Sequence, residues 1–180
     1  AEGEVLQLLN CHDPNVEEEN YLRVIRFKTA KLFEAATRLG AIIGNAAPAE
    51  ERALAIYGMH LGTAFQLIDD VLDYSSNNQD TGKNLGDDLA EGKPTLPLIY
   101  AIRAGTDEQA TIIRKAIEEG GKDGFQPVLQ VIQQTAALDY AKERAQAEAN
   151  TATAAIASLP DSEYKGFLLQ LADFAVTRNH

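Results

Sequence analysis

Three aspartates with helical spacing are the first residues in this chain that could do chemistry. Asp69, Asp70 and Asp73 lie in an otherwise apolar run between Gly58 and Tyr74, which contains no lysine or arginine. Spacings of three and four residues place side chains on one face of a helix, and the apolar neighbours predict that this helix is buried. Buried carboxylates need a cation. Mg²⁺ suits them, because it binds through one or two carboxylates plus substrate phosphates.

Two other interpretations of the aspartates are weaker. A solvated acidic face on a surface helix is disfavoured because the rest of this helix is too apolar. A calcium site is disfavoured because the carboxylates lie on a helix and not in a ligand loop of EF-hand spacing. Gln66 shares the polar face of the helix with the aspartates, so we count it as a further candidate.

Lys28 is the second clue, because helical spacing places it on the same stripe as Ile25 and Leu32. A lysine on a buried stripe must pair with another group, and the neighbouring Thr29 adds a hydroxyl donor. Together they make a plausible clamp for a phosphate oxygen. A lysine that reaches from a helix edge into water would give the same pattern.

Lys83 and Lys93 flank a polar, glycine-containing stretch at 75–93, directly after the aspartates. A loop of this length inside a compact domain is usually functional or disordered. Each lysine alone would be an ordinary surface residue. With the three aspartates nearby, they predict a place where cations and a polyphosphate meet.

The elements that must position these residues are helices. Helix-forming residues dominate, and no stretch shows the alternation of a strand. A capping box at Asn15-x-x-Glu18 predicts the start of a long helix to about Gly44, and Thr106-x-x-Gln109 predicts a second one. Further helices are expected at 48–74, 95–102, 124–134, 136–158 and 162–177, so the predicted fold class is an all-α helical bundle.

Composition excludes several classes of function. The chain has 180 residues, enough for one domain with a core, and its net charge of −11 disfavours nucleic acid and anionic lipid as partners. It contains no apolar run long enough for a transmembrane segment. One cysteine, Cys11, cannot form an internal disulfide and fits a reducing, cytoplasmic compartment. The opening residues contain no Met and no helix N-cap, so we expect the chain to be a fragment.

These motifs together resemble the trans-isoprenyl (polyprenyl) diphosphate synthases, with the bacterial octaprenyl diphosphate synthases as the most similar branch. The second aspartate-rich region of that family resembles residues 65–74, FQLIDDVLDY, and 82–98, GKNLGDDLAEGKPTLPL. The family's lysine–threonine helix resembles residues 21–36, which contain Lys28 and Thr29, and the helix before it resembles residues 3–8. The resemblance covers the whole chain.

The resemblance implies that residues 1–180 are the C-terminal half of one isoprenoid synthase (class I terpenoid synthase) domain. The family's first aspartate-rich motif would lie upstream. The implied reaction condenses isopentenyl diphosphate onto an allylic diphosphate and builds a long all-trans polyprenyl diphosphate, octaprenyl by similarity, for ubiquinone side chains. The implied protein is a Mg²⁺-dependent, cytoplasmic homodimer without a transmembrane segment. The fragment alone is expected to be inactive.

The resemblance also assigns roles to residues. Asp69 and Asp73 would hold Mg²⁺, with Asp70 as an additional or supporting ligand, and all three with Lys28 would be catalytic. Contacts to the diphosphate would come from five side chains: Lys28, Thr29, Gln66, Lys83 and Lys93. Three alternatives stay open: a synthase of another chain length from geranylgeranyl to nonaprenyl, a non-catalytic scaffold subunit, and, less favoured, a terpene cyclase.

Overall fold

The protein is a bundle of helices. The computed structural model describes residues 2–75, 86–121 and 124–178, and these ranges contain no strand. The helices are α1 (Glu2–Asn10), α2 (Glu18–Ile25), the π-helix η1 (Arg26–Ala30), α3 (Lys31–Ile43), α4 (Pro48–Leu72), α5 (Asp87–Ala90), α6 (Leu96–Ala104), α7 (Asp107–Glu119), α8 (Phe125–Gln134), α9 (Ala137–Ala155) and α10 (Glu163–Thr177). The predicted all-α class is confirmed.

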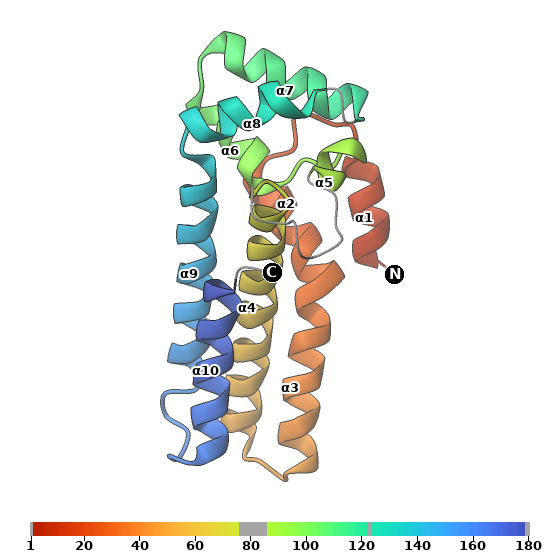
Figure 1. Ribbon diagram of the computed structural model, residues 1–180. Coiled ribbons are helices and arrows are strands. Elements are labelled where there is room, and N and C mark those ends of the chain that lie inside the picture. The colour runs from red at the N-terminus through yellow and green to blue at the C-terminus, as the bar shows by residue number, and fades with distance from the viewer. Residues whose placement is uncertain (1, 76–85, 122–123, 179–180) are drawn as a thin grey trace.

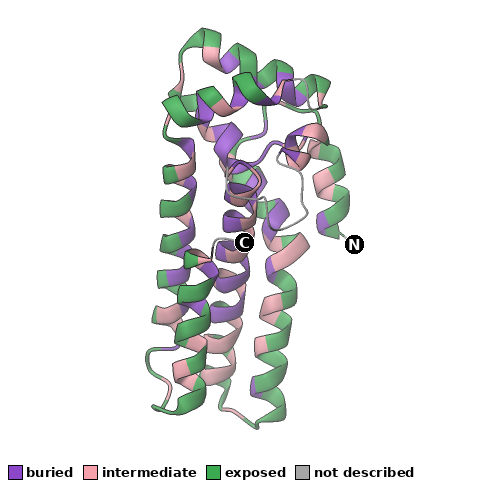
Figure 2. Ribbon diagram, in the orientation of Figure 1, coloured by how far each residue is buried: buried purple, intermediate pink, exposed green. Residues whose placement is uncertain are grey.

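The long helices α3, α4, α9 and α10 run side by side, and α7 and α8 lie across one end of them (Figure 1). Helix α4 contacts α3, η1, α9 and α10, so it is the central column. Figure 2 shows buried residues concentrated on α4 and on the inner side of α9. The central position of α4 confirms the prediction that the helix bearing the aspartates is buried.

The apolar residues of α4 explain that position. Tyr57, Leu61, Leu67, Ile68 and Val71 are each at most 3% exposed, and they follow helical spacing on more than one face. Pro48 begins the helix at its first turn, where its missing N–H costs nothing. The aspartates on this buried helix are therefore expected to face protein groups or a ligand and not bulk water.

The predicted apolar stripe of the long helix is correct in α2 and wrong in α3. Leu32, which spacing placed on the stripe of Ile25 and Lys28, is exposed, whereas Phe33 and Thr37 face α4. The reason is η1, a π-helical turn between the two halves. A π-turn inserts one extra residue, and the inward-facing positions therefore move along the chain by one residue.

Gly62 of α4 lets the π-turn approach the central column. A Cβ at this position would lie 2.6 Å from the Ala30 Cα atom and 3.0 Å from the Phe33 ring. The first of these is a backbone atom of η1, so no side-chain rotation can relieve the overlap. The absence of a side chain at Gly62 thus places the segment that carries Lys28 and Thr29 directly against α4.

We predict that Gly62→Ala lowers the free energy of unfolding by about 1–3 kcal/mol, because the added methyl group must push η1 away from α4. The matched control is Gly40→Ala in α3, where a Cβ would meet nothing within 4 Å. That change should stabilise the helix by about 0.5–1 kcal/mol, since alanine loses less backbone entropy on folding. Urea denaturation of both variants checks the prediction, and equal effects would contradict it.

Two capping predictions have different outcomes. The Thr106 box is confirmed: Gln109 N–H donates to Thr106 Oγ1 (3.3 Å), and Thr106 N–H donates to Gln109 Oε1 (2.8 Å). The Asn15 box is wrong, because α2 begins at Glu18 after Glu17 as its N-cap. Asn15 instead donates its backbone N–H to Asp13 Oδ1 (2.9 Å), and this local turn competes with a cap.

Within the described part of the predicted loop at 75–93, α5 occupies Asp87–Ala90. Residues 76–85 lie outside the described residues, and Lys83 is among them. Gly92 follows α5 with a positive φ of 67°, and a Cβ there would overlap the His12 ring. Only glycine meets both conditions easily, which explains why this residue precedes Lys93.

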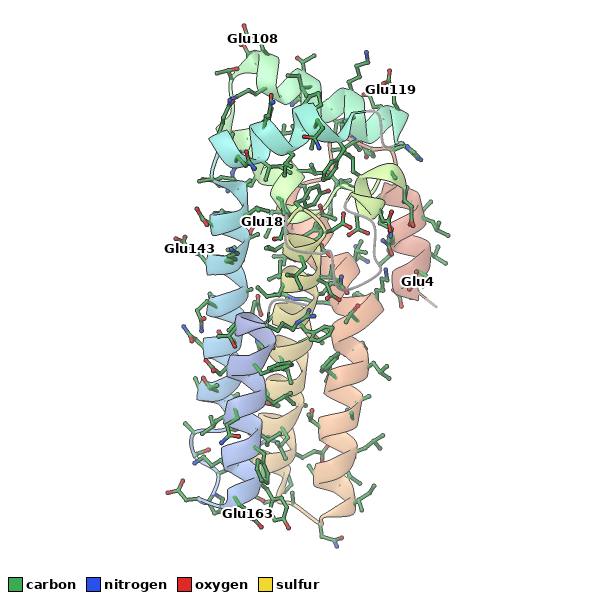
Figure 3. All side chains as sticks on the ribbon, in the orientation of Figure 1. Glu4, Glu18, Glu108, Glu119, Glu143 and Glu163 are labelled. Carbon is green, nitrogen blue, oxygen red and sulfur yellow. The ribbon has the colours of Figure 1, made fainter. Side chains whose placement is uncertain are left out.

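Among the described residues, none of the helices has the length and apolar character needed to cross a membrane. The labelled glutamates Glu4, Glu108, Glu119, Glu143 and Glu163 lie at the outer rim of the molecule (Figure 3). All five are exposed. These five carboxylates therefore lie in water, whereas Asp70 of the aspartate motif is buried.

Candidate functional site

One pocket is lined by four of the residues selected from the sequence: Lys28, Gln66, Asp70 and Lys93. Its walls come from α1, α2, η1, α4 and the segment 88–95, and they are lined by Gln7, Asn10, Tyr21, Val24, Ile25, Lys28, Gln66, Asp70, Asp88, Lys93, Pro94 and Thr95. Its volume is about 50 Å³, which is room for a few water molecules and not for a prenyl chain. The pocket is therefore suited to small polar groups.

Asp70 is the buried member of the aspartate motif, at 4% exposure. Tyr21 donates its hydroxyl to Asp70 Oδ2 (2.6 Å), and the Gln66 amide donates to Oδ1 (2.9 Å). Burial, with a contribution from the nearby charge of Asp88, raises the pKa of Asp70 to about 7. Both carboxylate oxygens are occupied by protein donors.

Asp69 and Asp73 are only half-buried. Asp69 Oδ1 accepts a hydrogen bond from the Arg178 guanidinium (2.6 Å), and that guanidinium lies 3.9 Å from the centre of the Phe65 ring. Asp73 Oδ2 accepts the backbone N–H of Asp88 (3.2 Å). Burial and the Asp88 carboxylate raise the pKa of Asp73 to about 6.

These residues fit a divalent cation bound together with a substrate. Within the described ranges, no group of three or more His, Cys, Asp or Glu side chains is arranged to hold a metal ion. Mg²⁺ does not require such a cage, because it takes one or two carboxylates and completes its shell with water and phosphate oxygens. Burial, with a smaller contribution from the Asp88 carboxylate, raises the pKa values of Asp70 and Asp73, and a cation bound beside them would favour their charged forms.

The cationic side of the pocket has two lysines in the described residues. Lys28 is half-buried and donates to Gln7 Oε1 (2.6 Å). Lys93 pairs with Asp88 (3.0 Å) and Glu91 (2.7 Å). Burial tends to lower the pKa of Lys93, but its bonds to Glu91 and Asp88 outweigh burial and raise the pKa above the ordinary value. Lys93 therefore carries its charge at neutral pH.

The structure brings Thr29 and Gln66 together as well. Thr29 donates its hydroxyl to Gln66 Oε1 (2.8 Å), so the two candidates are joined to Asp70 in one hydrogen-bonded series. The predicted group of Lys28, Thr29, Gln66, Asp70 and Lys93 is thus gathered in or beside one pocket. Asp69 and Asp73 lie on the same helix, α4 and its C-terminal cap.

Three residues of the site were absent from the sequence-based selection. Asp88 lies inside the motif after Lys83, and its spacing before Lys93 could have identified it. Tyr21 and Arg178 carried no local signal, because they reach Asp70 and Asp69 across 49 and 109 residues of chain. Such partners become visible only when the fold places distant helices together.

The comparisons with known proteins give a consistent result. The family model described as "Polyprenyl synthetase" matches residues 1–134. An octaprenyl diphosphate synthase of Haemophilus influenzae is 56% identical over 181 residues, which is 100% of this chain and 55% of that protein. An all-trans-nonaprenyl-diphosphate synthase of Rhodobacter capsulatus is 46% identical over 99% of this chain and 54% of its own length.

A solved structure is similar over nearly the same region. The polyprenyl synthase of Caulobacter crescentus, solved with calcium and isoprenyl diphosphate, has a TM-score of 0.93 and 42% identity over 99% of this chain and 55% of that one. The chain therefore has the all-α fold of the isoprenoid synthases and spans little more than half the length of the relatives it matches.

Proposed function

This chain belongs to the polyprenyl synthetase family, and on that premise we propose that it is the C-terminal half of a trans-polyprenyl diphosphate synthase domain. The complete enzyme would condense isopentenyl diphosphate onto an allylic diphosphate and build octaprenyl diphosphate for quinone side chains. The observation that carries this proposal is the pocket in which Lys28, Lys93 and Gln66 meet Asp70 of the aspartate motif. It joins anion-binding and cation-binding groups at one place.

The geometry suits the departure of pyrophosphate from an allylic carbon. Negative charge grows on the leaving oxygens as the carbon–oxygen bond breaks, and fixed positive groups lower the energy of that state. Lys28 and Lys93 would bind the diphosphate from this side, and Lys28 would exchange its Gln7 partner for a phosphate oxygen. Mg²⁺, held by Asp69 and Asp73, would supply further positive charge to the same oxygens.

A divalent cation is supported by the donor set and by the Caulobacter relative, which was solved with calcium. Magnesium is the proposed ion because carboxylates combined with phosphate oxygens suit it. The proposed diphosphate contacts are Lys28, Thr29, Gln66, Lys83 and Lys93. In the described structure the Thr29 hydroxyl donates to Gln66, so Thr29 would first have to release that bond.

Octaprenyl is the proposed product because the Haemophilus relative carries that name at the higher identity. The Rhodobacter relative makes nonaprenyl diphosphate by its name, so neighbouring chain lengths are the natural alternatives. The experiment is to incubate the complete synthase with isopentenyl diphosphate, an allylic starter and Mg²⁺, and to measure product length by chromatography. A product of eight isoprene units supports the proposal, and the absence of any polyprenyl product contradicts it.

We further propose that the enzyme is a cytoplasmic homodimer. Helices α1 and α3 expose large apolar side chains: Leu8, Leu9, Leu32 and Ile43 are each more than 70% exposed (72–79%). Apolar residues in such numbers favour association with another surface. Sedimentation equilibrium of the complete synthase tests the dimer, and a monomer at micromolar concentration counts against it.

We predict that Lys28→Ala in the complete synthase raises the KM for the allylic diphosphate by roughly 10–100-fold, the worth of one charge-assisted hydrogen bond. The matched control is Lys115→Ala, since Lys115 is exposed on α7 and pairs only loosely with Glu119 (3.8 Å). Steady-state kinetics with varied allylic substrate measures both. Equal KM values in the two variants would show that Lys28 is merely a partly solvated surface residue.

A further inference from the structure

Tyr21 is a buried tyrosine whose hydroxyl is committed to the aspartate motif. Its side chain lies on α2 at 5% exposure, and the hydroxyl donates to Asp70 Oδ2 over 2.6 Å. A buried tyrosine hydroxyl needs only one hydrogen-bond acceptor, and a backbone carbonyl is enough, as Leu168 is for Tyr57. Tyr21 instead bonds to a carboxylate, which makes the hydrogen bond charge-assisted.

The other hydrogen bonds around Asp70 fix the orientation of its carboxylate. Asp70 Oδ1 accepts from the Gln66 amide, and the carbonyl of the same Gln66 side chain accepts from Thr29. The amide of Gln66 is thereby fixed in one orientation, with its NH₂ toward Asp70. The Asp70 carboxylate is held from two sides, by α2 through Tyr21 and by η1 through Thr29 and Gln66.

We infer that Tyr21 is a positioning residue of the proposed site: with Gln66 it holds the Asp70 carboxylate in one orientation in the pocket that also contains Lys28 and Lys93. The inference rests on the proposed function. Asp70 lines the pocket together with Lys28 and Lys93, so the orientation of its carboxylate affects the charge that a bound cation and diphosphate would meet there. Tyr21 itself lines the pocket and acts through Asp70.

The test compares two tyrosine-to-phenylalanine changes in the complete synthase. Tyr21→Phe and Tyr57→Phe each remove one hydroxyl and keep the ring, and each breaks one bond of a buried tyrosine (2.6 Å and 2.7 Å). Both variants should lose some stability in urea. Only Tyr21→Phe should weaken Mg²⁺ binding in the presence of pyrophosphate, by roughly 10–100-fold, the effect typical of groups that orient a metal-binding carboxylate. Titration calorimetry measures that affinity.

A double-mutant cycle shows whether Tyr21 acts through Asp70. In an Asp70→Asn background, Tyr21→Phe should cause little additional loss of Mg²⁺ affinity, because the group that it positions has already changed. Additive losses would overturn the inference. Equal Mg²⁺ affinities in Tyr21→Phe and Tyr57→Phe would overturn it too, since the hydroxyl would then serve stability alone.

A second measurement separates this inference from the proposed function. The side-chain amide signals of Gln66 in a ¹⁵N spectrum should shift in Tyr21→Phe, while those of Gln109, bonded to Gln134 (2.7 Å), stay in place. If the wild-type synthase failed to bind Mg²⁺ with pyrophosphate, the proposed function would fall, and the Gln66 signals would still report whether Tyr21 orients Asp70. Unchanged Gln66 signals would refute the positioning role.

Discussion

Asp69→Asn in the complete synthase should reduce kcat by about 10²–10³-fold, the loss typical of removing one group that stabilises charge in the transition state. Asparagine has nearly the shape of aspartate but lacks the negative charge that a cation requires. Asp69 is the right member of the motif to change, because it is half-buried and lies outside the hydrogen-bonded series that holds Asp70. Steady-state kinetics at several Mg²⁺ concentrations measures the effect.

The control for Asp69→Asn is Asp139→Asn, which removes an exposed carboxylate from the first turn of α9. Asp69 also bonds to Arg178, so a circular dichroism spectrum and a urea titration must show that the variant folds like the wild type. Near-normal turnover in a folded Asp69→Asn synthase would remove this carboxylate from the proposed metal site. A loss shared with Asp139→Asn would point to a general effect of charge.

The helical fold was predictable because its information is local. The apolar residues of α4 repeat with helical spacing over 25 residues, and the Thr106 box marks a helix start by itself. The register of α3 was not predictable, because η1 adds one residue to the turn that carries Lys28 and Thr29. The residue types of Arg26–Ala30 do not predict a π-helical turn. In the structure, this turn packs against Gly62.

The candidate site likewise combines residues that local spacing predicts with residues that only the fold brings together. Asp69, Asp70, Asp73 and Gln66 share one helix, so spacing alone placed them together. Of the two groups that hold Asp70, Gln66 lies on the same helix, whereas Tyr21 lies on another one, and no periodicity connects Tyr21 to Asp70. Sequence patterns therefore identified the charged groups and left their supporting contacts to the fold.

We expect residues 1–180, expressed alone, to fold and to form no measurable polyprenyl diphosphate, because the proposed mechanism holds the diphosphate from two sides. The described structure offers the groups of one side: Lys28 and Lys93 in the pocket, with Asp69 and Asp73 on α4. The cations that one cluster of carboxylates could hold would leave much of the negative charge on the departing pyrophosphate unbalanced. The exposed apolar residues of α1 and α3 should also make the isolated chain self-associate.

The measurement is a condensation assay in two mixtures with excess Mg²⁺. The first contains residues 1–180 alone, and the second also contains the remaining upstream half of a synthase as a separate chain. Product only in the second mixture supports a site completed from both sides, and analytical ultracentrifugation should then show the self-associated species of the first mixture replaced by a defined complex. Product in the first mixture would show that one aspartate cluster suffices. In that case the groups already gathered around Lys28 and Asp69 would have to carry the whole reaction.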